Sequence, residues 1–537
     1  DGVFVALIVN YMKGLIRFIL LLAIMLWFGA APAQQNQGRT AVHIEHANYM
    51  EGAARFGKNV QALFGNVSFR HHQTLMHCDS AFFYRESNRV HAYGSIHVIQ
   101  NDTIHLYGDT LYYYGDQDKA MVRNNVRLVN KNVVLTTNFL DYDRKTDVAY
   151  YFNGGEIVSD NNRLVSNWGY YYPRSEEAHF RRDVVVTNPD YKMYSDTLLY
   201  YTIPEIVKIV GPTSIISERN EIYSEAGYYD TKNDIAQLER NSSIVGEEQS
   251  LKGDTIYYDR KSGFGEVFSN MFLLDSANHV IITGNYGYYN ELTKRALATK
   301  RAVLMQVHQN DTLFLHADTL RADPIEDTEY QLVRAYHNVK FYRPDMQGRC
   351  DSMVYDLRDS INTFYKDPIL WANLNQMSAG TIKLHTRNNA LYKAELIDNA
   401  FVVAPEDTGS YNQIKGRHMT GYISNNELRR IDVEGNGQTI YYPKDNDEII
   451  GINRAESSNL SILLENQKVS GIILRTQPSG NMNPPYLLDA EARKLQGFRW
   501  LEEYRPKTKE DIFIRTKDPE PIQQVSYSDF HFDRSLP

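Results

Sequence analysis

The segment GDTLYYYGDQDKAMV, residues 108–122, returns in closely related form as GDTIYYDRKSGFGEV at residues 253–267. Two further variants, SDTLLYY at 195–201 and EAGYYDTKNDIAQL at 225–238, lie between them. Each phrase contains an acidic residue followed by a run rich in tyrosine and aliphatic residues, and tyrosine and β-branched residues favour strands. The repetition of this phrase, rather than any single motif, decides the fold.

The spacing of the phrases is nearly constant. One residue before each strand-like run serves as an anchor, and successive anchors are 30, 29, 29, 29, 29, 29, 31, 33 and 33 residues apart. Internal repeats of about 20–50 residues indicate a solenoid, a propeller or a stacked array. Weaker copies give roughly thirteen units between residues 40 and 480. The anchors are Asp79, Asp109, Asn138, Asn167, Asp196, Glu225, Asp254, Asn285, Asp318 and Asp351.

A second signature lies some fifteen residues before each anchor. It places Gly, Asn or Asp before alternating apolar residues, as in FGNVSF at 64–69 and RNNVRL at 123–128. This pattern predicts a tight turn that opens a half-buried strand. Each repeat should therefore contain two antiparallel strands and two turns. No sustained helical periodicity interrupts the repeats.

The second strand of each repeat changes its parity in the middle. In TIHLYGDTLYYY, residues 103–114, Ile104 and Leu106 share a parity with Gly108, whereas Leu111 and Tyr113 have the opposite one. Such a change requires a bulge or a sharp bend. We expect long strands, bent beside each anchor, that stack into two facing sheets with one shared inner surface. The anchor carboxylates should cap turns rather than bind metal.

The alternating apolar residues that follow each Gly/Asn/Asp signature are the candidates for lining that inner surface. The alternative is an ordinary core between two sheets, although the wall of a groove is also a core face. Each pair of adjacent tyrosines should place one ring on the inner face and one on the outer face. The outer ring could stack either on neighbouring repeats or on carbohydrate. The candidate lining residues are Val67, Phe69, Ile96, Val98, Val126, Leu128, Val184, Val186, Val303, Met305, Val339 and Phe341.

At this point the sequence resembles the OstA-like, or LptA-type, family of lipopolysaccharide transport proteins. The resemblance rests on the alternation of Gly65-Asn66-Val67-x-Phe69 phrases with Ala317-Asp318-Thr319-Leu320 phrases across about residues 40–480. It implies an all-β fold, an elongated open β-jellyroll whose apolar interior carries the acyl chains of lipid A between the inner and outer membranes. It also implies partners of the same fold at both membranes, and end-to-end self-association is open because the terminal strands are unpaired edges.

The two ends of the chain differ from the repeats. Residues 12–35 combine Lys13 and Arg17 with an apolar stretch and an A-x-A site at Ala31–Ala33, which is typical of a signal peptide cleaved after Ala33. Met12 is then the expected start and residues 1–11 an upstream artefact. We therefore expect a signal peptide at 1–33, the repeats at 34–480, in one module or two, and a Pro- and charge-rich extension with a short helix at 481–537. The mature protein should be periplasmic, and association with the outer membrane is open.

Composition excludes several other functions. The net charge of −9 leaves no basic surplus for nucleic acid. The two cysteines, Cys78 in HCDS and Cys350 in RCDS, occupy matching repeat positions and read as small buried side chains. The sequence contains no H-E-x-x-H, C-x-x-C, G-x-S-x-G or P-loop motif, so neither an enzyme nor a metal or cofactor site is expected. The remaining alternatives are a structural or adhesive envelope array and a polysaccharide-active β-solenoid enzyme.

Overall fold

The structure, a computed structural model, describes residues 41–515 of the 537. Within that range it leaves out residues 54 and 56 and short gaps at 101–103, 131–132, 144, 147, 160–161, 173–174, 176, 190, 202–203, 205, 219, 231–232, 234, 248, 260, 277–278, 291, 308–310, 329, 388–389, 426, 447 and 466–467. The expected signal peptide lies outside the described residues. No helix among those described is long and apolar enough to cross a membrane.

The chain forms two compact units that divide between Asn270 and Met271. The first unit consists almost entirely of strands, most of them 11 or 12 residues long. They are β1 (His43–His46), β2 (Tyr49–Gly52), β3 (Val60–His71), β4 (Thr74–Tyr84), the 3-10 turn η3 (Arg85–Ser87), β5 (Arg89–Gln100), β6 (Ile104–Tyr114), β7 (Lys119–Asn130), β8 (Val133–Asp143), β9 (Val148–Tyr151), β10 (Gly155–Ser159), β11 (Asn162–Ser166), β12 (Trp168–Tyr172), β13 (Glu177–Asn188), β14 (Tyr191–Tyr201), β15 (Ile206–Ser217), β16 (Asn220–Asp230), β17 (Ile235–Gly246) and β18 (Gln249–Asp259).

The divide falls inside β19 (Phe264–Asp275). The second unit continues with the same kind of strand and ends in short 3-10 helices. Its elements are β20 (Val280–Asn290), β21 (Arg295–Val307), β22 (Thr312–Pro324), β23 (Gln331–Arg343), β24 (Met346–Asp356), β25 (Ile361–Tyr365), β26 (Ile369–Ala372), β27 (Asn375–Ser378), β28 (Thr381–Arg387), β29 (Ala390–Asp407), β30 (Ser410–Ser424), β31 (Glu427–Tyr441), β32 (Lys444–Asp445), β33 (Glu448–Ile449), β34 (Ile452–Glu465), β35 (Lys468–Arg475), β36 (Ser479–Asn483), η4 (Pro485–Leu487), η5 (Glu502–Tyr504) and η6 (Asp511–Phe513).

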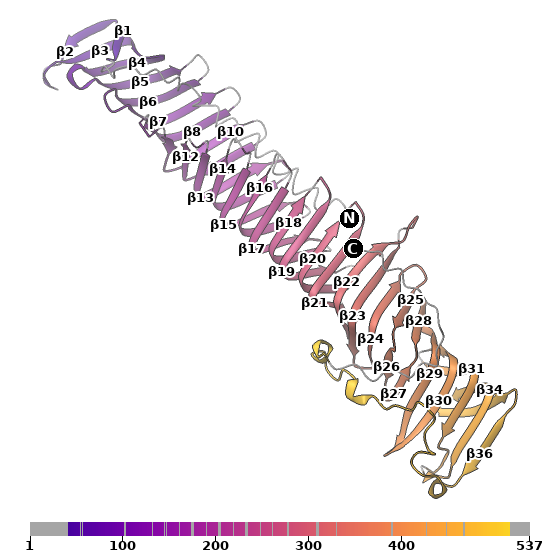
Figure 1. Ribbon diagram of the computed structural model, residues 1–537. Coiled ribbons are helices and arrows are strands. Elements are labelled where there is room, and N and C mark those ends of the chain that lie inside the picture. The colour runs from indigo at the N-terminus through magenta and orange to yellow at the C-terminus, as the bar shows by residue number, and fades with distance from the viewer. Residues whose placement is uncertain are drawn as a thin grey trace, which may run out of the picture. The chain divides into compact units, whose positions relative to one another are not determined.

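Strand pairing in both units follows the order of the chain. In the first unit β3 to β8 and β13 to β18 each pair antiparallel with the next strand, which produces the ladder seen in Figure 1. Between these runs, β9 with β10 and β11 with β12 are the separate halves of two bent strands. In the second unit β25 to β28 repeat this split arrangement. The prediction of two antiparallel strands per repeat is confirmed.

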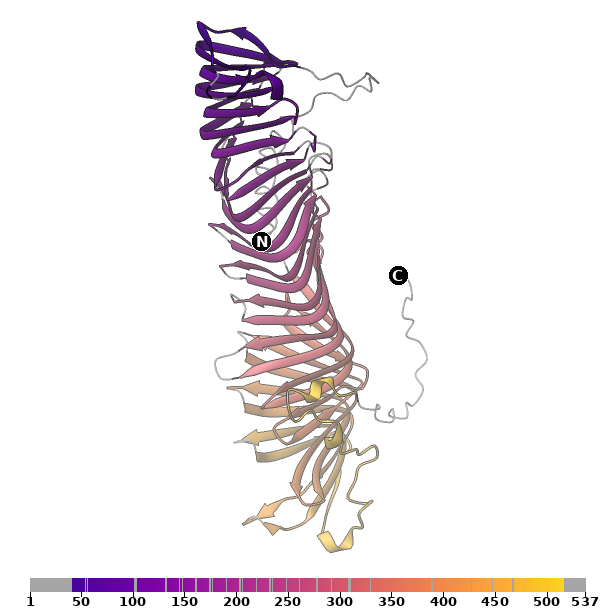
Figure 2. The ribbon, with the colours of Figure 1, turned by 90° about the vertical axis from the view of Figure 1, so that its left-hand side faces the viewer.

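Each long strand bends at a corner, and in every second strand, from β3 onward, one or two corner residues adopt a positive φ. The bends in the strands of the first unit are visible in Figure 2. The partner register shifts at the same places, as between Phe64 and Val67 of β3. This corrects one prediction, because Gly65-Asn66 does not open a strand but bends β3 in its middle. The first positive-φ residues of the successive corners in this unit are Gly65, Gly94, Asn124, Asn153, Arg182, Gly211, Arg240 and Ser269.

The corners divide each strand between two layers. We call layer I the half that contains Val67–His71 of β3, which pairs with Thr74–Cys78 of β4, and layer II the half that contains Val60–Phe64, which pairs with Ser80–Tyr84. Later strands continue both layers with the same pairing. The expected bend beside each anchor is thus confirmed, and it creates the shared inner surface.

The anchor side chains bind the corner of the following strand. Asp109 accepts a hydrogen bond from Asn125 Nδ2 at 2.7 Å, and Asp254 accepts one from Asn270 at 2.9 Å. Glu225 and Asn241 make the same contact. These carboxylates therefore hold backbone corners together, as the expectation of turn capping implied, but they act across neighbouring strands.

Asn241 offers a test of the corner geometry. Its φ is 52° and its side chain donates to Glu225 Oε1 at 2.9 Å. Asn241→Val should lower the free energy of unfolding by about 1–3 kcal/mol, because a β-branched residue is strained in the left-handed region. Asn241→Gly should lose only about 1 kcal/mol, since it gives up the hydrogen bond without the strain. Urea unfolding measures both, and equal losses would contradict the corner as the cause.

Residues 484–515 pack on the second unit as an extended segment, drawn in yellow in Figure 1. The short helix expected near Leu487–Gln496 is a 3-10 turn at Pro485–Leu487, followed by hydrogen-bonded turns such as Lys494 N to Glu491 O. Pro484 and Pro485 stand at the start of this turn, a position that proline tolerates, so they do not by themselves end a helix. The contacts of this segment with the strands, rather than helix formation, determine its path.

Candidate functional site

An uninterrupted row of apolar side chains follows layer I through the first unit. Each member is the direct cross-strand partner of the next, so all of them share one face of the layer. We call this set the apolar row, and its members show no charged or hydrogen-bonding side chain. In order of pairing it contains Phe69, Met76, Val98, Leu106, Leu128, Leu135, Ile157, Leu164, Val186, Met193, Ile215, Ile222, Ile244 and Leu251.

Layer II supplies the opposite wall, and at some points the two walls touch. The ring centroids of Phe69 in layer I and Phe83 in layer II are 6.1 Å apart. Nearby, His71 Nδ1 and the Tyr113 hydroxyl are 2.5 Å apart, which joins the two layers by a hydrogen bond. The inner space is therefore filled by side chains at the β3–β4 end. From Leu135 to Ile244 the apolar row is likewise buried.

The row is accessible in two places: at Leu251, its half-buried member on β18, and at three consecutive members on β5, β6 and β7. Val98, Leu106 and Leu128 are half-buried, and so is Ile104 at the end of β6. Val98 pairs with Leu106 and Leu106 with Leu128, so these residues form one contiguous patch on β5, β6 and β7. We call these four residues the open sector. It contains three consecutive half-buried members of the row, whereas at the β18 end only Leu251 is half-buried.

The structure places most of the predicted lining residues on the inner face. Phe69, Val98, Leu128 and Val186 belong to the apolar row itself. Four others lie directly after a corner and are buried beside the row: Val67, Ile96, Val126 and Val184. Val339 and Phe341 occupy the corresponding two positions in the second unit, after the corner at His337-Asn338.

Val303 and Met305 were assigned to the wrong face. The corner of β21 is Lys300-Arg301, so the residue directly after it is Ala302, which is fully buried and pairs with Ala317. Alternation then puts Leu304 inside and Val303 outside. Val303 pairs with His316, whose ring contacts Phe513 of the C-terminal segment at 4.9 Å. The error is one residue of register.

The second unit has its own apolar row, built by the same pairing rule. This row also follows layer I, but it contains one glycine and one threonine, Gly348 and Thr439, in place of large apolar side chains. Its members are Ile282, Leu304, Leu315, Phe341, Gly348, Leu370, Met377, Val402, Ile414 and Thr439. Phe341 meets Phe364 of the opposite wall with ring centroids 5.7 Å apart, which closes the inner space there.

Small residues stand at the inside of each corner because the bend leaves little room. A Cβ on Gly108 would lie 2.5 Å from Val122 Cγ1, and one on Gly253 would lie 2.3 Å from Val267 Cγ1. Elsewhere the position holds serine, and Ser195 Oγ donates to the carbonyl of Thr197 at 3.2 Å. The hydroxyl thereby gives the Thr197 carbonyl, beside the bulge, a hydrogen-bond donor.

Cys78 and Cys350 occupy this same corner position, which confirms that they are equivalent. They pair with Val67 and Val339, and both are buried free thiols. Burial raises the pKa of the Cys78 thiol to about 12, and the charge of Asp79 adds to the effect. Burial also raises the pKa of Cys350.

The thiols should therefore be inert in the folded protein. At neutral pH neither cysteine should react with a maleimide, because each thiol is both protonated and shielded. Mass spectrometry of protein labelled before and after denaturation measures this, and denatured protein is the control that should label at both sites. Rapid labelling of Cys78 in the native protein would contradict the closed corner.

Residues that sequence reasoning missed lie mainly on the opposite wall. Tyr200 and Tyr229 are almost fully buried on the inner face of layer II, and Phe180 is buried beside them. The doubled tyrosines were the available signal, since one ring of each pair was expected inside. Among the described residues, no group of three or more His, Cys, Asp or Glu side chains could hold a metal ion.

Comparison with known proteins adds a family. Residues 39–196 and 217–308 match the model of a family described as "OstA-like protein". Among solved structures, a similar chain is LptH, described as the LptA homologous periplasmic component of the conserved lipopolysaccharide transport device from Pseudomonas aeruginosa. It is 15% identical, and the match covers 20% of this chain and 81% of that chain with a TM-score of 0.19. The search of curated proteins returned no match.

Proposed function

Because this chain belongs to the OstA-like family, we propose that it binds lipopolysaccharide through the acyl chains of lipid A and takes part in its transport. The observation that carries the proposal is the apolar row, in which fourteen consecutive strand positions, by direct pairing, offer only apolar side chains. A path for fatty acyl chains needs such continuity, because a single charged group would interrupt it.

The energetics of acyl-chain binding favour such a site. Burial of each CH₂ contributes about 0.8 kcal/mol, so several acyl chains supply a large driving force for leaving water. Movement along the row needs similar affinity at successive positions. The repeat supplies this similarity, because every strand pair presents an aliphatic, methionine or phenylalanine side chain at the same place.

We infer that acyl chains enter at the open sector and part the two layers as they advance. The half-buried state of Val98, Leu106 and Leu128 supports this point of entry. The members of the row beyond the open sector are buried, so the two layers would have to separate slightly there, one repeat after another. The proposed location is the periplasm, where the protein would pass lipopolysaccharide toward the outer membrane.

Photocrosslinking tests the proposal with a matched pair on β7. A photoreactive amino acid at Leu128 should crosslink to lipopolysaccharide in the native envelope, because this side chain faces the inner surface. The same group at Arg127, one residue earlier, is exposed on the outer face and should not crosslink. Equal labelling at the two positions, or at neither, would contradict lipid binding along the row.

A further inference from the structure

The C-terminal segment, residues 488–515, lies on the outer face of the second unit and is held by side chains that recognise its backbone. Gln413 Nε2 donates to the carbonyl of Arg493 at 2.8 Å, and Gln413 Oε1 accepts from the amide of Leu495 at 2.8 Å. Gln413 therefore hydrogen-bonds to one carbonyl and one amide of the segment, two residues apart, as the backbone of a neighbouring strand would.

Gln376 makes the same pair of hydrogen bonds six residues further along the segment. Its Nε2 donates to the carbonyl of Arg499 at 2.9 Å, and its Oε1 accepts from the amide of Leu501 at 2.8 Å. Gln376 and Gln413 are each only 1% exposed. Buried amide groups that point outward to a peptide backbone form a built site, because without the segment their polar atoms would lose these partners.

Apolar side chains of the segment pack on the second unit beside Gln376 and Gln413. Leu501 is buried against Ile369 and Trp371. Leu495 is buried in a cluster with residues of β29, β31 and β34 and with the residue that follows β31, namely Phe401, Val403, Ile440, Ile452 and Tyr442. These residues make two apolar clusters on the outside of the unit, each covered by one leucine of the segment. Monomeric proteins rarely leave large apolar patches uncovered.

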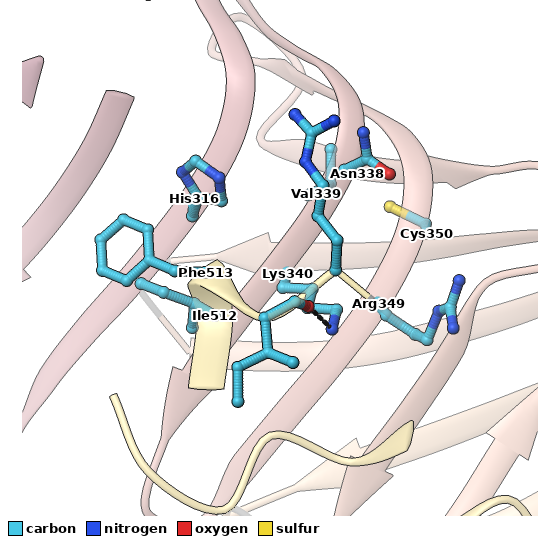
Figure 3. Close-up of a pocket in the computed structure, with 10 residues that line it drawn as sticks. His316, Asn338, Val339, Lys340, Arg349, Cys350, Ile512 and Phe513 are labelled. Atoms are coloured by element: carbon cyan, nitrogen blue, oxygen red, sulfur yellow. Dashed lines mark hydrogen bonds between the residues drawn. The ribbon is translucent and has the colours of Figure 1, made fainter. Parts of the chain in front are cut away.

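The far end of the segment is fixed by η6 and the residues after it. Ile512 and Phe513 lie over β22 and β23, where the Lys340 ammonium donates to the Ile514 carbonyl, as Figure 3 shows. Arg301 stacks over the Phe513 ring with its guanidinium carbon 4.8 Å from the centroid.

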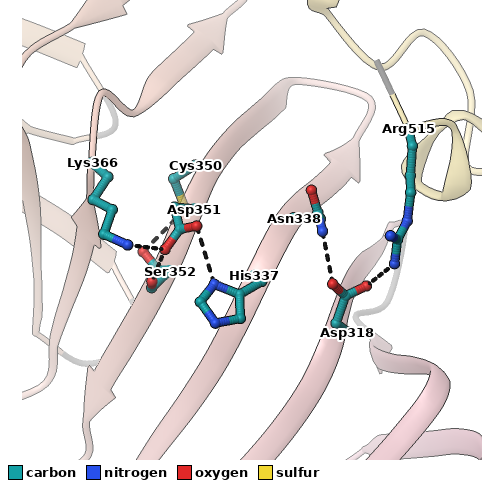
Figure 4. Close-up of polar contacts among 8 residues, drawn as sticks. All are labelled: Asp318, His337, Asn338, Cys350, Asp351, Ser352, Lys366 and Arg515. Atoms are coloured by element: carbon teal, nitrogen blue, oxygen red, sulfur yellow. Dashed lines mark hydrogen bonds and ion pairs between the residues drawn. The ribbon is translucent and has the colours of Figure 1, made fainter. Parts of the chain in front are cut away.

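Arg515 adds an ion pair at this end. It contacts Asp318 at 2.5 Å, and Asp318 also accepts from the corner side chain of Asn338 at 2.7 Å (Figure 4). The neighbouring corner carboxylate, Asp351, forms ion pairs with His337 and Lys366 instead. Of these two carboxylates, the segment therefore binds Asp318 and not Asp351.

We propose that the outer face of the second unit is a binding site for an extended peptide, and that residues 488–515 are its intramolecular ligand, which binds and leaves without unfolding the strands beneath. Between Pro484 and Arg515 the segment adds no strand to the layers. Side chains such as Gln376 and Gln413 hold its backbone, and Arg505 in turn donates to the carbonyl of Asn373. The inner apolar row does not include any of them. The proposal is independent of lipid binding.

The test uses the full chain with a protease site inserted between Tyr486 and Leu487, which are 82% and 65% exposed. After cleavage, a fluorescent synthetic peptide of residues 488–515 should exchange with the released fragment and bind, whereas uncleaved protein should not bind it. Gln376→Leu and Gln413→Leu should each weaken the peptide by about tenfold, since each removes two buried hydrogen bonds. Gln331→Leu, on the layer II half of β23, is the matched control.

Two results would overturn the proposal: a cleaved fragment that never exchanges, or a peptide that binds cleaved, uncleaved and glutamine-variant proteins alike. Hydrogen exchange of the unaltered protein provides a second measurement that does not depend on the insertion. The amides of Leu495 and Leu501 should exchange through local opening, faster than the amide of Leu396 within β29. Exchange of all three only by global unfolding would make the segment a permanent part of the fold.

Discussion

Val186→Asp should destabilise the first unit by more than about 4 kcal/mol and abolish lipid binding. Val186 is fully buried in the apolar row, between Leu164 and Met193. An aspartate there must either be protonated or remain as an unpaired charge among aliphatic groups, and both states are costly. The same carboxylate would interrupt the path that acyl chains are proposed to follow, so binding and stability should fall together.

Val185→Asp is the matched control, because this half-buried neighbour faces outward beside Tyr194. It should change the free energy of unfolding by less than about 1 kcal/mol and leave lipid binding intact. Urea unfolding, followed by the fluorescence of Trp168 in the same unit, reports stability, and mass spectrometry of co-purified lipid reports binding. If both variants lose stability equally, the assignment of inner and outer faces is wrong.

A milder variant separates the two effects. Val186→Ala removes two methyl groups without adding charge and should cost about 1–3 kcal/mol through the lost burial and the cavity left behind. Lipid binding should survive in this variant, because the row stays apolar. Loss of binding in Val186→Ala, at a temperature where the protein is folded, would mean that stability rather than continuity of the row controls the result of Val186→Asp.

Much of this architecture can be predicted from the sequence because the repeat restates it. Strand number, antiparallel pairing and the bend beside each anchor follow from the period and from the parity change around Gly108 and Leu111. Local alternation decides these features, and local alternation is what a sequence displays. The family model extends over residues 39–308 with one gap, which is the region where the period is most regular.

The corners show where local reasoning fails. Gly65-Asn66 has the residues of a hairpin turn, because both hairpins and corners need a positive φ. Sequence alone does not distinguish them. In β21 the corner residues are Lys300 and Arg301, which carry no signal for positive φ, so the register slipped by one and Val303 was placed inside instead of Ala302.

The C-terminal segment was beyond prediction for a different reason. Its position depends on Gln347, Gln376 and Gln413, which are far from it in the sequence. Gln347 and Gln376 are 29 residues apart, but Gln413 follows only after 37 residues, so the three do not form a regular repeat. Gln347 accepts from Arg505 at 2.8 Å across 158 residues of chain. The sequence around an outward-facing glutamine does not indicate that its side chain will bind a distant segment. A Pro- and charge-rich stretch likewise does not indicate which surface it will cover.

Trp371→Ala should cost the second unit about 3–5 kcal/mol. Trp371 is fully buried on the outer face of β26, where it packs against Ile369 and Leu501 beneath the C-terminal segment. Truncation leaves a cavity the size of an indole and removes the surface on which Leu501 rests. The segment should then be released more often, so limited proteolysis should cleave it faster than in the unaltered protein.

Trp500→Ala provides the comparison, because Trp500 belongs to the segment itself and is only half-buried against Tyr411. It should cost roughly half as much, since less apolar surface is lost from contact. Urea midpoints and proteolysis rates of both variants decide the matter. If Trp371→Ala lowers stability without faster cleavage of the segment, the indole supports the strands alone. If neither quantity changes, the outer face does not depend on its cover, and burial of Trp371 there contributes nothing to holding the segment.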